Sequence, residues 1–373
     1  MVEYLWRHGT VFDLFLSLDV LHDPAKYGLR GSWAAGVRSR IPAVERTALQ
    51  AVMKSYIWAF PWAATLPEPC DGRAALDALA QIPASERFTT LASYYMDGRI
   101  HAVLIDVAGR KGWDNSNKEA LTAAYCTRKT AHPLSKLPSD QDLTQMLTVW
   151  SDVAGYGEAW LAALNAYYKA FFAEEEARIQ PSLETAVSHA QSLAKAMPLP
   201  ELLEKLSQGL LFTDVADIQK IIMIPSFWVT PLSVFTPVRL DGPGQWAFMF
   251  GARPSAMSLV PGDVVPDALF QSLKALADPT RLRILRYLST EELTPAELAR
   301  RLRLRPPTVI HHLHALRLAR LVHLTISSGG KRYAVRPEAV DATSALLSTY
   351  LKGEMRQMSG NFDHNLLQPE VSP

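Results

Sequence analysis

The chain has 373 residues, of which 48% are apolar and 20% charged, with two cysteines and a formal net charge of +1. These totals exclude a disordered chain and a disulfide-rich secreted scaffold, and they allow a large core in two or three domains. The first residues carry several charges and lack a basic leader, and no run of about 18 apolar residues occurs. We therefore expect a cytoplasmic protein without a membrane span.

The charge is distributed unevenly along the chain. Residues 270–340 contain 13 Lys and Arg against 5 Asp and Glu, a net charge of +8, whereas residues 1–269 carry a net charge of −5. A short basic segment on an otherwise acidic chain indicates a module that binds a polyanion.

The N-terminal part is expected to be mainly helical. Val11, Leu14 and Leu18 share one helical face, and a long helix is predicted from about residue 151 to 179, ended or bent by Pro181. Strands separated by turns are predicted only at about 218–250. We expect a domain at 1–252, followed by a linker at 253–266 that is rich in proline and glycine.

Three stretches of this domain could carry chemistry. LWRHGT (5–10) resembles the strand-end Arg-His-Gly of histidine phosphatases, but a helix-rich stretch follows and no later His-Gly partner occurs, so a polar turn is preferred. The three glutamates of AEEEAR (173–178) are interpreted as a solvated helix face. The aromatic side chains that could line an apolar pocket, with core packing as the preferred alternative, are Tyr156, Trp160, Tyr167, Tyr168, Phe171 and Phe172.

The basic segment contains two clear helix starts. Asp278 can cap a helix whose first residue is Pro279, and Thr294 with Glu297 forms a capping box before LARRL. Side chains expected to face inward are Leu282, Leu285 and Leu288, and those expected to reach solvent are Arg281, Arg283 and Arg286. Two short helices joined by a tight turn form a helix-turn-helix arrangement.

The stretch RPPTVIHHLHALR (305–317) is predicted to be the second helix of that arrangement. Because a residue before proline avoids the helical region, Arg305 and Pro306 should be extended and Pro307 should be the first helical residue. The residues expected to pack inward are Val309, Leu313 and Leu316, with His312 half-buried beside them. Thr308 and His311 should meet base edges, and His314 and Arg317 should lie nearer the phosphates.

A two-stranded hairpin is predicted after this helix. In LVHLTISSGGKRYAVR (321–336) apolar and polar residues alternate, Ser328 to Gly330 form a turn, and Lys331 with Arg332 begins the return strand. A hairpin with a basic tip after a helix-turn-helix is a wing, whose Lys331 and Arg332 could neutralise phosphates. His311 and His314 could share a zinc ion, but further ligands are missing nearby, so we expect no metal.

Residues 267 to about 340 resemble the winged-helix domain of ArsR-type bacterial transcriptional regulators. The stretches that carry the resemblance are LKALADPTRLRILRYL, TPAELARRLRL and PPTVIHHLHALRLARLV. The resemblance implies binding to double-stranded DNA and a homodimer formed by helices at about 267–277 and 337–351. In the second of these, Val340, Leu347 and Tyr350 form an apolar stripe that could instead pack on its own domain.

This sequence departs from the family at two points. Arg305 and Pro306 replace the usual serine at the head of the recognition helix, so base preference cannot be carried over. Metal-sensing members carry paired cysteines on a core helix or Asp and His ligands on the last helix, whereas the basic segment here has no cysteine and PEAVDATSALLSTYLKGEM has no histidine. The whole chain also resembles a subset of ArsR-type regulators with a long uncharacterised N-terminal domain, through GLRGSWAAGVRSRIP and IPSFWVTPLSVF. That resemblance implies effector sensing or dimerisation.

We therefore expect a mainly α protein with a large helical N-terminal domain, a winged helix-turn-helix domain at 267–340, and a helix and tail at 341–373. The expected function is a non-enzymatic DNA-binding transcriptional regulator, more often a repressor in this family, with an unknown small-molecule effector and no cofactor. The residues expected to contact DNA are Arg305, Pro307, Thr308, His311, His314, Arg317, Lys331 and Arg332. The alternatives are a hydrolase- or phosphatase-like N-terminal enzyme fused to a DNA-binding module, or a protein-interaction scaffold.

Overall fold

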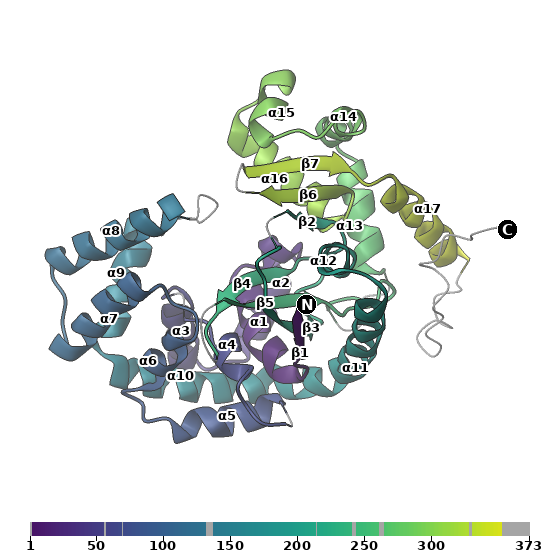
Figure 1. Cartoon of the computed structure of the whole chain (residues 1–373). Helices are drawn as coiled ribbons and strands as arrows, with labels where there is room; N and C mark the ends of the chain where they lie inside the picture. Colours follow the sequence, from purple (N-terminus) through teal and green to yellow (C-terminus); the bar gives the residue numbers. More distant parts are fainter. Residues whose placement is uncertain are drawn as a thin grey trace. The chain divides into compact units, whose positions relative to one another are not determined.

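The computed structural model describes residues 2–55, 57–68, 70–131, 137–213, 215–240, 244–260, 265–327 and 330–352 (Figure 1). The chain divides into two compact units, unit 1 with Met1–Ala252 and Ile326–Gly330, and unit 2 with Arg253–Thr325 and Lys331–Pro373. The predicted turn at Ser328 and Gly329, part of the predicted linker (261–264) and the predicted tail from residue 353 lie outside the described residues. No helix within these residues has both the length and the apolar character that a membrane span requires.

Unit 1 is mainly helical, as the sequence predicts. Its helices are α1 (Thr10–His22), η1 (Pro24–Tyr27), α2 (Gly31–Ser39), α3 (Ala43–Met53), α4 (Phe60–Ala63), α5 (Gly72–Gln81), α6 (Arg87–Ser93), α7 (Gly98–Arg110), α8 (Asn115–Ala131), α9 (Asp140–Ser151), α10 (Val153–Tyr167), η2 (Tyr168–Phe172), α11 (Ala173–Ala196) and α12 (Leu199–Ser207).

The predicted long helix differs from the observed one at its end. A π-helical turn, η2, joins α10 to α11, and α11 continues to Ala196 with Pro181 inside it. Of the two alternatives that the sequence left open, that Pro181 ends the helix is therefore wrong, because the helix continues for several turns beyond it. The cost of a proline in a helix is about 3 kcal/mol, and α11 offsets it by burying Ile179, Leu183 and Val187 along one face.

A four-stranded sheet forms part of unit 1. Its strands are β1 (Glu3–Trp6), β3 (Lys220–Ser226), β5 (Gln245–Gly251) and β4 (Val234–Val238), in the order β1-β3-β5-β4. The first three are parallel, and β4 pairs antiparallel with β5 at the edge. The sequence predicted the strands within 218–250 but missed β1, because four residues are too few to show a period of two.

Proline positions fit this strand order. The pairing of β1 with β3 stops at Met223. Pro225 therefore lies beyond the end of β1, where no strand would accept a hydrogen bond from an N–H group at this position. Pro237 lies in β4, which is an edge strand. Proline cannot donate to the ladder, so it fits strand positions where its nitrogen faces no neighbouring strand.

One face of the sheet is covered by α11 and α12. Ile221 and Met223 of β3 and Phe248 and Phe250 of β5 belong to one buried cluster with leucines of α12. Side chains alternate along a strand, so Ile222 and Ile224 point to the opposite face, and α1 also contacts β3. The parallel strands are thus apolar on both faces, which explains their continuous hydrophobic sequence.

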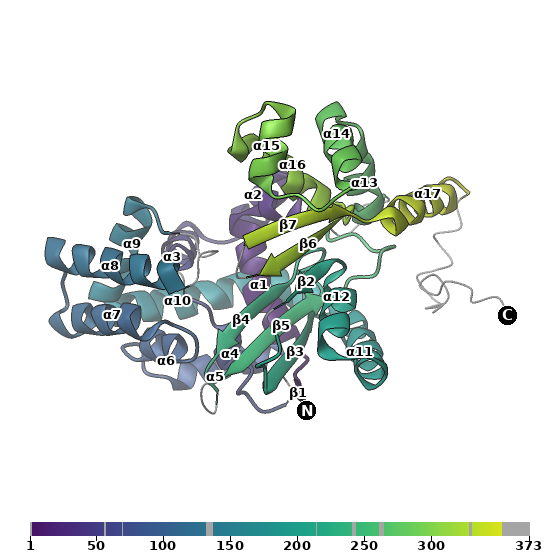
Figure 2. The same ribbon diagram turned by 45° about the horizontal axis from the view of Figure 1, so that its top comes forward.

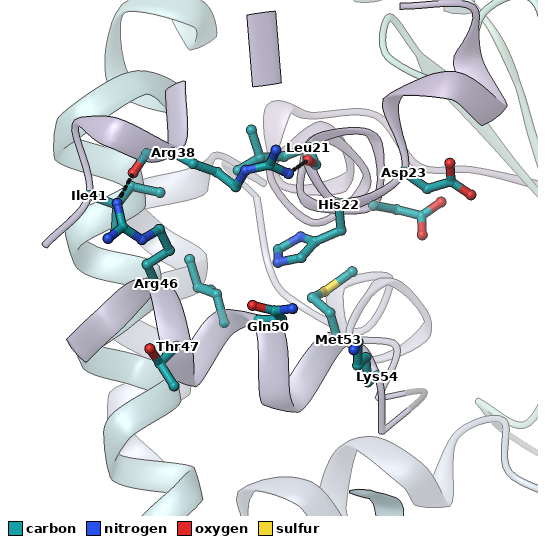
Figure 3. Close-up of a pocket in the computed structure, with 12 residues that line it drawn as sticks. Leu21, His22, Asp23, Arg38, Ile41, Arg46, Thr47, Gln50, Met53 and Lys54 are labelled. Carbon is teal, nitrogen blue, oxygen red and sulfur yellow. Dashed lines mark hydrogen bonds between the residues drawn. The ribbon is translucent and has the colours of Figure 1, made fainter. Parts of the chain in front are cut away.

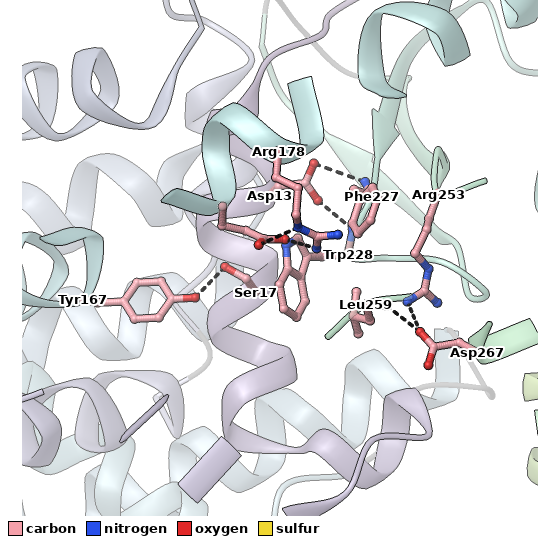
Figure 4. A network of polar contacts seen from close by, with 10 residues as sticks. Asp13, Ser17, Tyr167, Arg178, Phe227, Trp228, Arg253, Leu259 and Asp267 are labelled. Atoms are coloured by element: carbon pink, nitrogen blue, oxygen red, sulfur yellow. Dashed lines mark hydrogen bonds and ion pairs between the residues drawn. The ribbon is translucent and has the colours of Figure 1, made fainter. Parts of the chain in front are cut away.

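A buried carboxylate fixes the chain just after β3 (Figure 4). Asp13 of α1 is fully buried and accepts hydrogen bonds from the Ser226 hydroxyl at 2.6 Å, the Trp228 N–H at 2.8 Å and the Phe227 N–H at 3.2 Å. Burial raises the pKa of Asp13 to about 7 despite these three donors. Asp13 therefore ties the first turn of α1 to the end of the central strand.

Unit 2 contains the predicted winged helix-turn-helix. Its helices are α13 (Asp267–Leu276), α14 (Pro279–Leu288), α15 (Pro295–Leu302), α16 (Pro306–Leu318) and α17 (Pro337–Leu351), and strands β6 (Val322–Ser327) and β7 (Gly330–Val335) are hydrogen-bonded neighbours. Figure 2 shows α14, α15 and α16 grouped beside this pair of strands. A short strand, β2 (Leu210–Phe212), also occurs in the chain.

Two helices of unit 2, α14 and α15, begin where the sequence predicts. The Asp278 side chain accepts from the Arg281 N–H, and Thr294 and Glu297 form a complete capping box with Pro295 at the first position of α15. Leu298, Leu302 and the inward residues of α16 lie in one buried core with Ile284, Leu285 and Leu288. The predicted fold class, mainly α with a few strands and a C-terminal winged helix-turn-helix, is confirmed.

Candidate nucleic-acid interface

The N-terminal end of α16 is formed by two consecutive prolines. Arg305 is extended (φ −73°, ψ 142°) and precedes the helix, which begins at Pro306 rather than at the predicted Pro307. Proline has the backbone φ that the first helical turn requires, so Pro306 can enter the helix although another proline follows it. Pro307 is therefore the second helical residue, and it is exposed.

This helix end leaves no free backbone donor in its first turn. Pro306 and Pro307 lack an N–H group, and the N–H groups of Thr308 and Val309 both donate to the Arg305 carbonyl oxygen, at 3.0 and 3.3 Å. Many helices bind phosphate through free N–H groups at this end. Here phosphate contacts must come from side chains, and Arg305 supplies an exposed guanidinium at that point.

The first turns of α16 expose the residues predicted to face bases. Thr308 and His311 are exposed, whereas Val309, Leu313 and Leu316 are buried, so the predicted division of the helix into two faces is confirmed. The structure adds Ile310, which is 55% exposed and was not predicted. An exposed isoleucine on a recognition helix has the chemistry to contact a thymine methyl group.

The other histidines of α16 lie nearer the core. His312 is half-buried, as predicted, and its Nδ1 is 3.9 Å from Oδ1 of Asp278. Burial lowers the pKa of His312, and the negative charge of Asp278 opposes that shift. His314 is partly buried. No group of three or more His, Cys, Asp or Glu side chains that could hold a metal occurs among the described residues.

Arg317 and Lys331 bring two positive charges together. Arg317 lies in the last turn of α16 and Lys331 in β7, so helix and wing each contribute one cation. Partial desolvation lowers the pKa of Lys331, and the charge of Arg317 lowers it further. Within the described part of the chain neither side chain has an ion-pair partner. Like charges held together without a counter-ion favour an anionic ligand.

The side chain of Arg332 is held by protein contacts that the sequence did not predict. Its guanidinium donates to the Glu292 carbonyl oxygen at 2.6 Å and lies 3.9 Å from the carboxylates of Glu292 and Glu297. The neighbouring Tyr333 exchanges both backbone hydrogen bonds with Leu293, so β7 is joined to the residues before α15. Arg332 therefore also fixes the wing to the helix-turn-helix.

Two predictions for α14 are wrong. Leu282 is 48% exposed, and Ile284 takes the expected inward position beside Leu285 and Leu288. Arg281 does not reach freely into solvent, because its guanidinium donates to the carbonyl oxygens of Ala275 and Lys274 at the end of α13. The sequence pattern could not show this because the helix packs on two neighbours.

Further exposed arginines border the helix-turn-helix. Arg283 and Arg286 are exposed on α14, as predicted. Arg300 near the end of α15 and Arg303 in the turn after it are also exposed, and the sequence analysis did not single them out. Their density in RRLRLR was the available signal, since a run of arginines flanking a recognition helix is an electrostatic footprint for phosphate.

The Arg-His-Gly stretch of unit 1 joins the parallel strand β1, which the sequence did not predict, to α1, so the preferred interpretation as a turn before a helix fits. The Arg7 N–H donates to the Met223 carbonyl oxygen, which extends the pairing of β1 with β3. Gly9 (φ 152°) is required structurally, because a Cβ there would collide with the Cys70 carbonyl oxygen. The glycine of this stretch thus has a packing role at the turn into α1.

The three glutamates of α11 do not form one solvated face. Glu174 is exposed, but Glu175 is buried and paired with Arg178, and Glu176 accepts from the Gly72 N–H at 2.7 Å and the Tyr168 hydroxyl at 2.6 Å. Consecutive helical residues point about 100° apart, so one of the three had to face the core. Of the aromatic cluster, Trp160, Tyr167 and Phe172 are buried in the core.

Comparison with known families identifies the C-terminal segment. Residues 278–323 match the family model of bacterial regulatory proteins of the arsR family, which spans α14, α15, α16 and the start of β6. The chain matches no curated protein. Residues 278–323 are therefore an ArsR-family helix-turn-helix domain in a chain with a long N-terminal region, and this domain makes the chain a DNA-binding transcriptional regulator.

Proposed function

We propose that this regulator is a homodimeric repressor whose N-terminal region binds a small-molecule effector. The observation that carries the DNA-binding part is the exposed start of α16, flanked by cations from the preceding turn and the wing. Residues Thr308 and His311 read bases, Pro307 packs against the sugar-phosphate backbone, and the phosphate contacts come from Arg305, His314, Arg317, Lys331 and Arg332.

The dimer proposal is supported by α13 and α17, which pack against each other. Leu273 of α13 and Val340 and Leu351 of α17 are 40%, 41% and 74% exposed. Exposed apolar side chains on neighbouring helices favour burial against a second copy. A homodimer would place two recognition helices about 34 Å apart, in successive turns of one DNA face.

Effector control follows from the geometry of such a dimer. A ligand that binds one arrangement of the N-terminal region more tightly shifts the population toward it and changes the separation of the recognition helices. The N-terminal region acts by binding rather than by catalysis, in this proposal. Its buried and half-buried carboxylates support this, because Asp13, Glu175 and Glu176 already accept hydrogen bonds from donors of the fold.

The proposal is tested by selecting bound fragments from genomic DNA with the purified full chain. Enriched fragments should share an inverted repeat, and a reporter placed behind one should be expressed less when the protein is present. Sedimentation should give a dimer that Leu351→Glu weakens. Enrichment of unrelated sequences, or raised reporter expression, would contradict base reading or repression respectively.

A further inference from the structure

Unit 1 contains a cavity between α1, α2 and α3 that the DNA-binding function does not use (Figure 3). Its volume is about 500 Å³, within the range of about 300–1,000 Å³ that small-molecule sites occupy. It is lined by residues of the last turn of α1, the end of α2 and one face of α3. We name it the α1–α3 cavity.

Three cations border the α1–α3 cavity, namely Arg38, Arg46 and Lys54. Figure 3 shows Arg38 and Arg46 on one side and Lys54 on the other. Arg38 donates to the Leu21 carbonyl oxygen at 2.8 Å, and Arg46 donates to the Arg38 carbonyl oxygen at 3.2 Å. Carbonyl partners orient a guanidinium but leave its positive charge uncompensated.

The carboxylates at the cavity edge do not neutralise these cations. Asp19 is bound by the Lys26 ammonium and the Tyr27 hydroxyl, each at 2.6 Å. Asp23 is exposed and caps η1 by accepting from the Lys26 N–H. For the part of the chain that the structure describes, no carboxylate lies within ion-pair distance of Arg38, Arg46 or Lys54.

His22 provides a polar group inside the same cavity. Its Nδ1 lies 2.7 Å from the Leu18 carbonyl oxygen, so Nδ1 carries the proton and Nε2 remains available. Burial lowers the pKa of His22, and the charges of Arg38 and Lys54 lower it further, whereas the hydrogen bond to the Leu18 carbonyl oxygen and the charge of Asp19 raise it.

The remaining wall is mainly apolar: Leu21, Ile41, Leu49 and Met53 line it, together with the polar side chains of Thr47 and Gln50. A cavity with cations on one part of its surface and aliphatic side chains on another fits a ligand with a charged head and an apolar body. An inorganic anion would use only the first part, and a neutral hydrocarbon only the second.

We infer that the α1–α3 cavity binds a small organic anion, a carboxylate or a phosphate ester, with its head toward Arg38, Arg46 and Lys54. The apolar body lies against Leu21, Ile41, Leu49 and Met53. This inference deepens the proposed effector-binding function and gives the effector a chemical class. It concerns ligand binding, which is measurable in the full chain without DNA.

Calorimetric titration of the full chain with hexanoate, hexyl phosphate and hexanol tests the inference. At least one hexyl anion should bind measurably and hexanol should bind at least about tenfold more weakly, because it lacks the charged head. The anion that binds more tightly shows whether the charged head of the ligand is a carboxylate or a phosphate ester. Equal binding of hexanol and both anions, or no binding of either anion, would overturn the inference.

Lys54→Gln and Arg40→Gln form a matched pair of variants. Lys54 borders the cavity and its ammonium has no protein partner among the described residues, whereas Arg40 is exposed at the end of α2 outside the lining. Lys54→Gln should weaken the hexyl anion several-fold to about tenfold, and Arg40→Gln should leave it unchanged. If both variants lose the same affinity for the hexyl anion, the binding is due to general charge attraction and the assignment of the site to the cavity is wrong.

A second measurement separates this inference from the proposed function. Operator affinity should be measured with and without the bound anion. If the anion binds through Lys54 but leaves operator affinity unchanged, the anion-binding inference is supported and the proposed effector-sensing function is wrong. If another molecule shifts operator affinity while the hexyl anions do not bind, sensing stands and the cavity assignment fails.

Discussion

Arg317 of α16 lies close enough to Lys331 of β7 that its charge lowers the pKa of the lysine. The last turn of the recognition helix and the start of the return strand of the wing therefore present one common cationic surface. A phosphate placed there would relieve the repulsion between the two side chains. The energetic consequence is that binding to any duplex should be strengthened, regardless of its sequence.

Replacing Lys331 and Arg332 by alanine should weaken binding to every DNA sequence and flatten its salt dependence. Each lost phosphate contact should reduce the slope of log K against log salt by about 1. Fluorescence anisotropy between about 50 and 200 mM salt measures this slope. Because Arg332 also contacts Glu292 and Glu297, Lys331→Ala alone is the cleaner variant. An unchanged slope would remove the wing from the interface.

Replacing Thr308 or His311 by alanine should change sequence preference rather than overall affinity. Each lost base contact should cost about 1–3 kcal/mol on the matching sequence and much less on others. Competition between the operator and single-base variants measures the preference. Val309→Ala is the control, since Val309 is buried and should affect stability instead. A uniform loss across sequences would make these side chains backbone contacts.

Removal of divalent metal should leave DNA binding intact. His312 of the three clustered histidines is half-buried near Asp278, and His311 is exposed on the opposite side of the helix axis from the core. Anisotropy curves with and without a chelator should superimpose. A chelator-dependent shift in operator affinity would require ligands beyond the described residues and would contradict this prediction.

Asp13 should make the stability of unit 1 depend on pH. Burial raises its folded-state pKa to about 7 from 3.8, so the folded state holds a proton that the unfolded state releases. The contribution of Asp13 to the free energy of unfolding is fully present below about pH 4. It is lost as the pH rises to about 7, and the total loss is up to about 4 kcal/mol. Asp13→Asn should flatten the difference between unfolding free energies at pH 5 and pH 7.5. An equally steep dependence in this variant would assign it to other groups.

The sequence by itself determined the C-terminal module. Its caps and leucine spacing act within a few residues, so Asp278 and Thr294 set helix starts locally, and the buried face of α16 followed from its period although its predicted start was one residue late. Family resemblance and local chemistry agreed there, which is why the fold class and the exposure of Thr308 and His311 were predictable.

The tertiary structure alone decided which side chains are free to act. Arg281 was predicted to reach solvent and Arg332 to neutralise phosphate, but carbonyl oxygens of other elements accept hydrogen bonds from both guanidinium groups. Likewise β1 depends on its pairing with β3, and the burial of Glu175 and the convergence of Arg38, Arg46 and Lys54 on one cavity depend on how whole helices pack together. The period of a sequence pattern depends only on the helix or strand that contains a residue. Tertiary packing decides which groups a side chain contacts, and therefore whether its charge is paired, whether it is buried and whether a ligand can reach it.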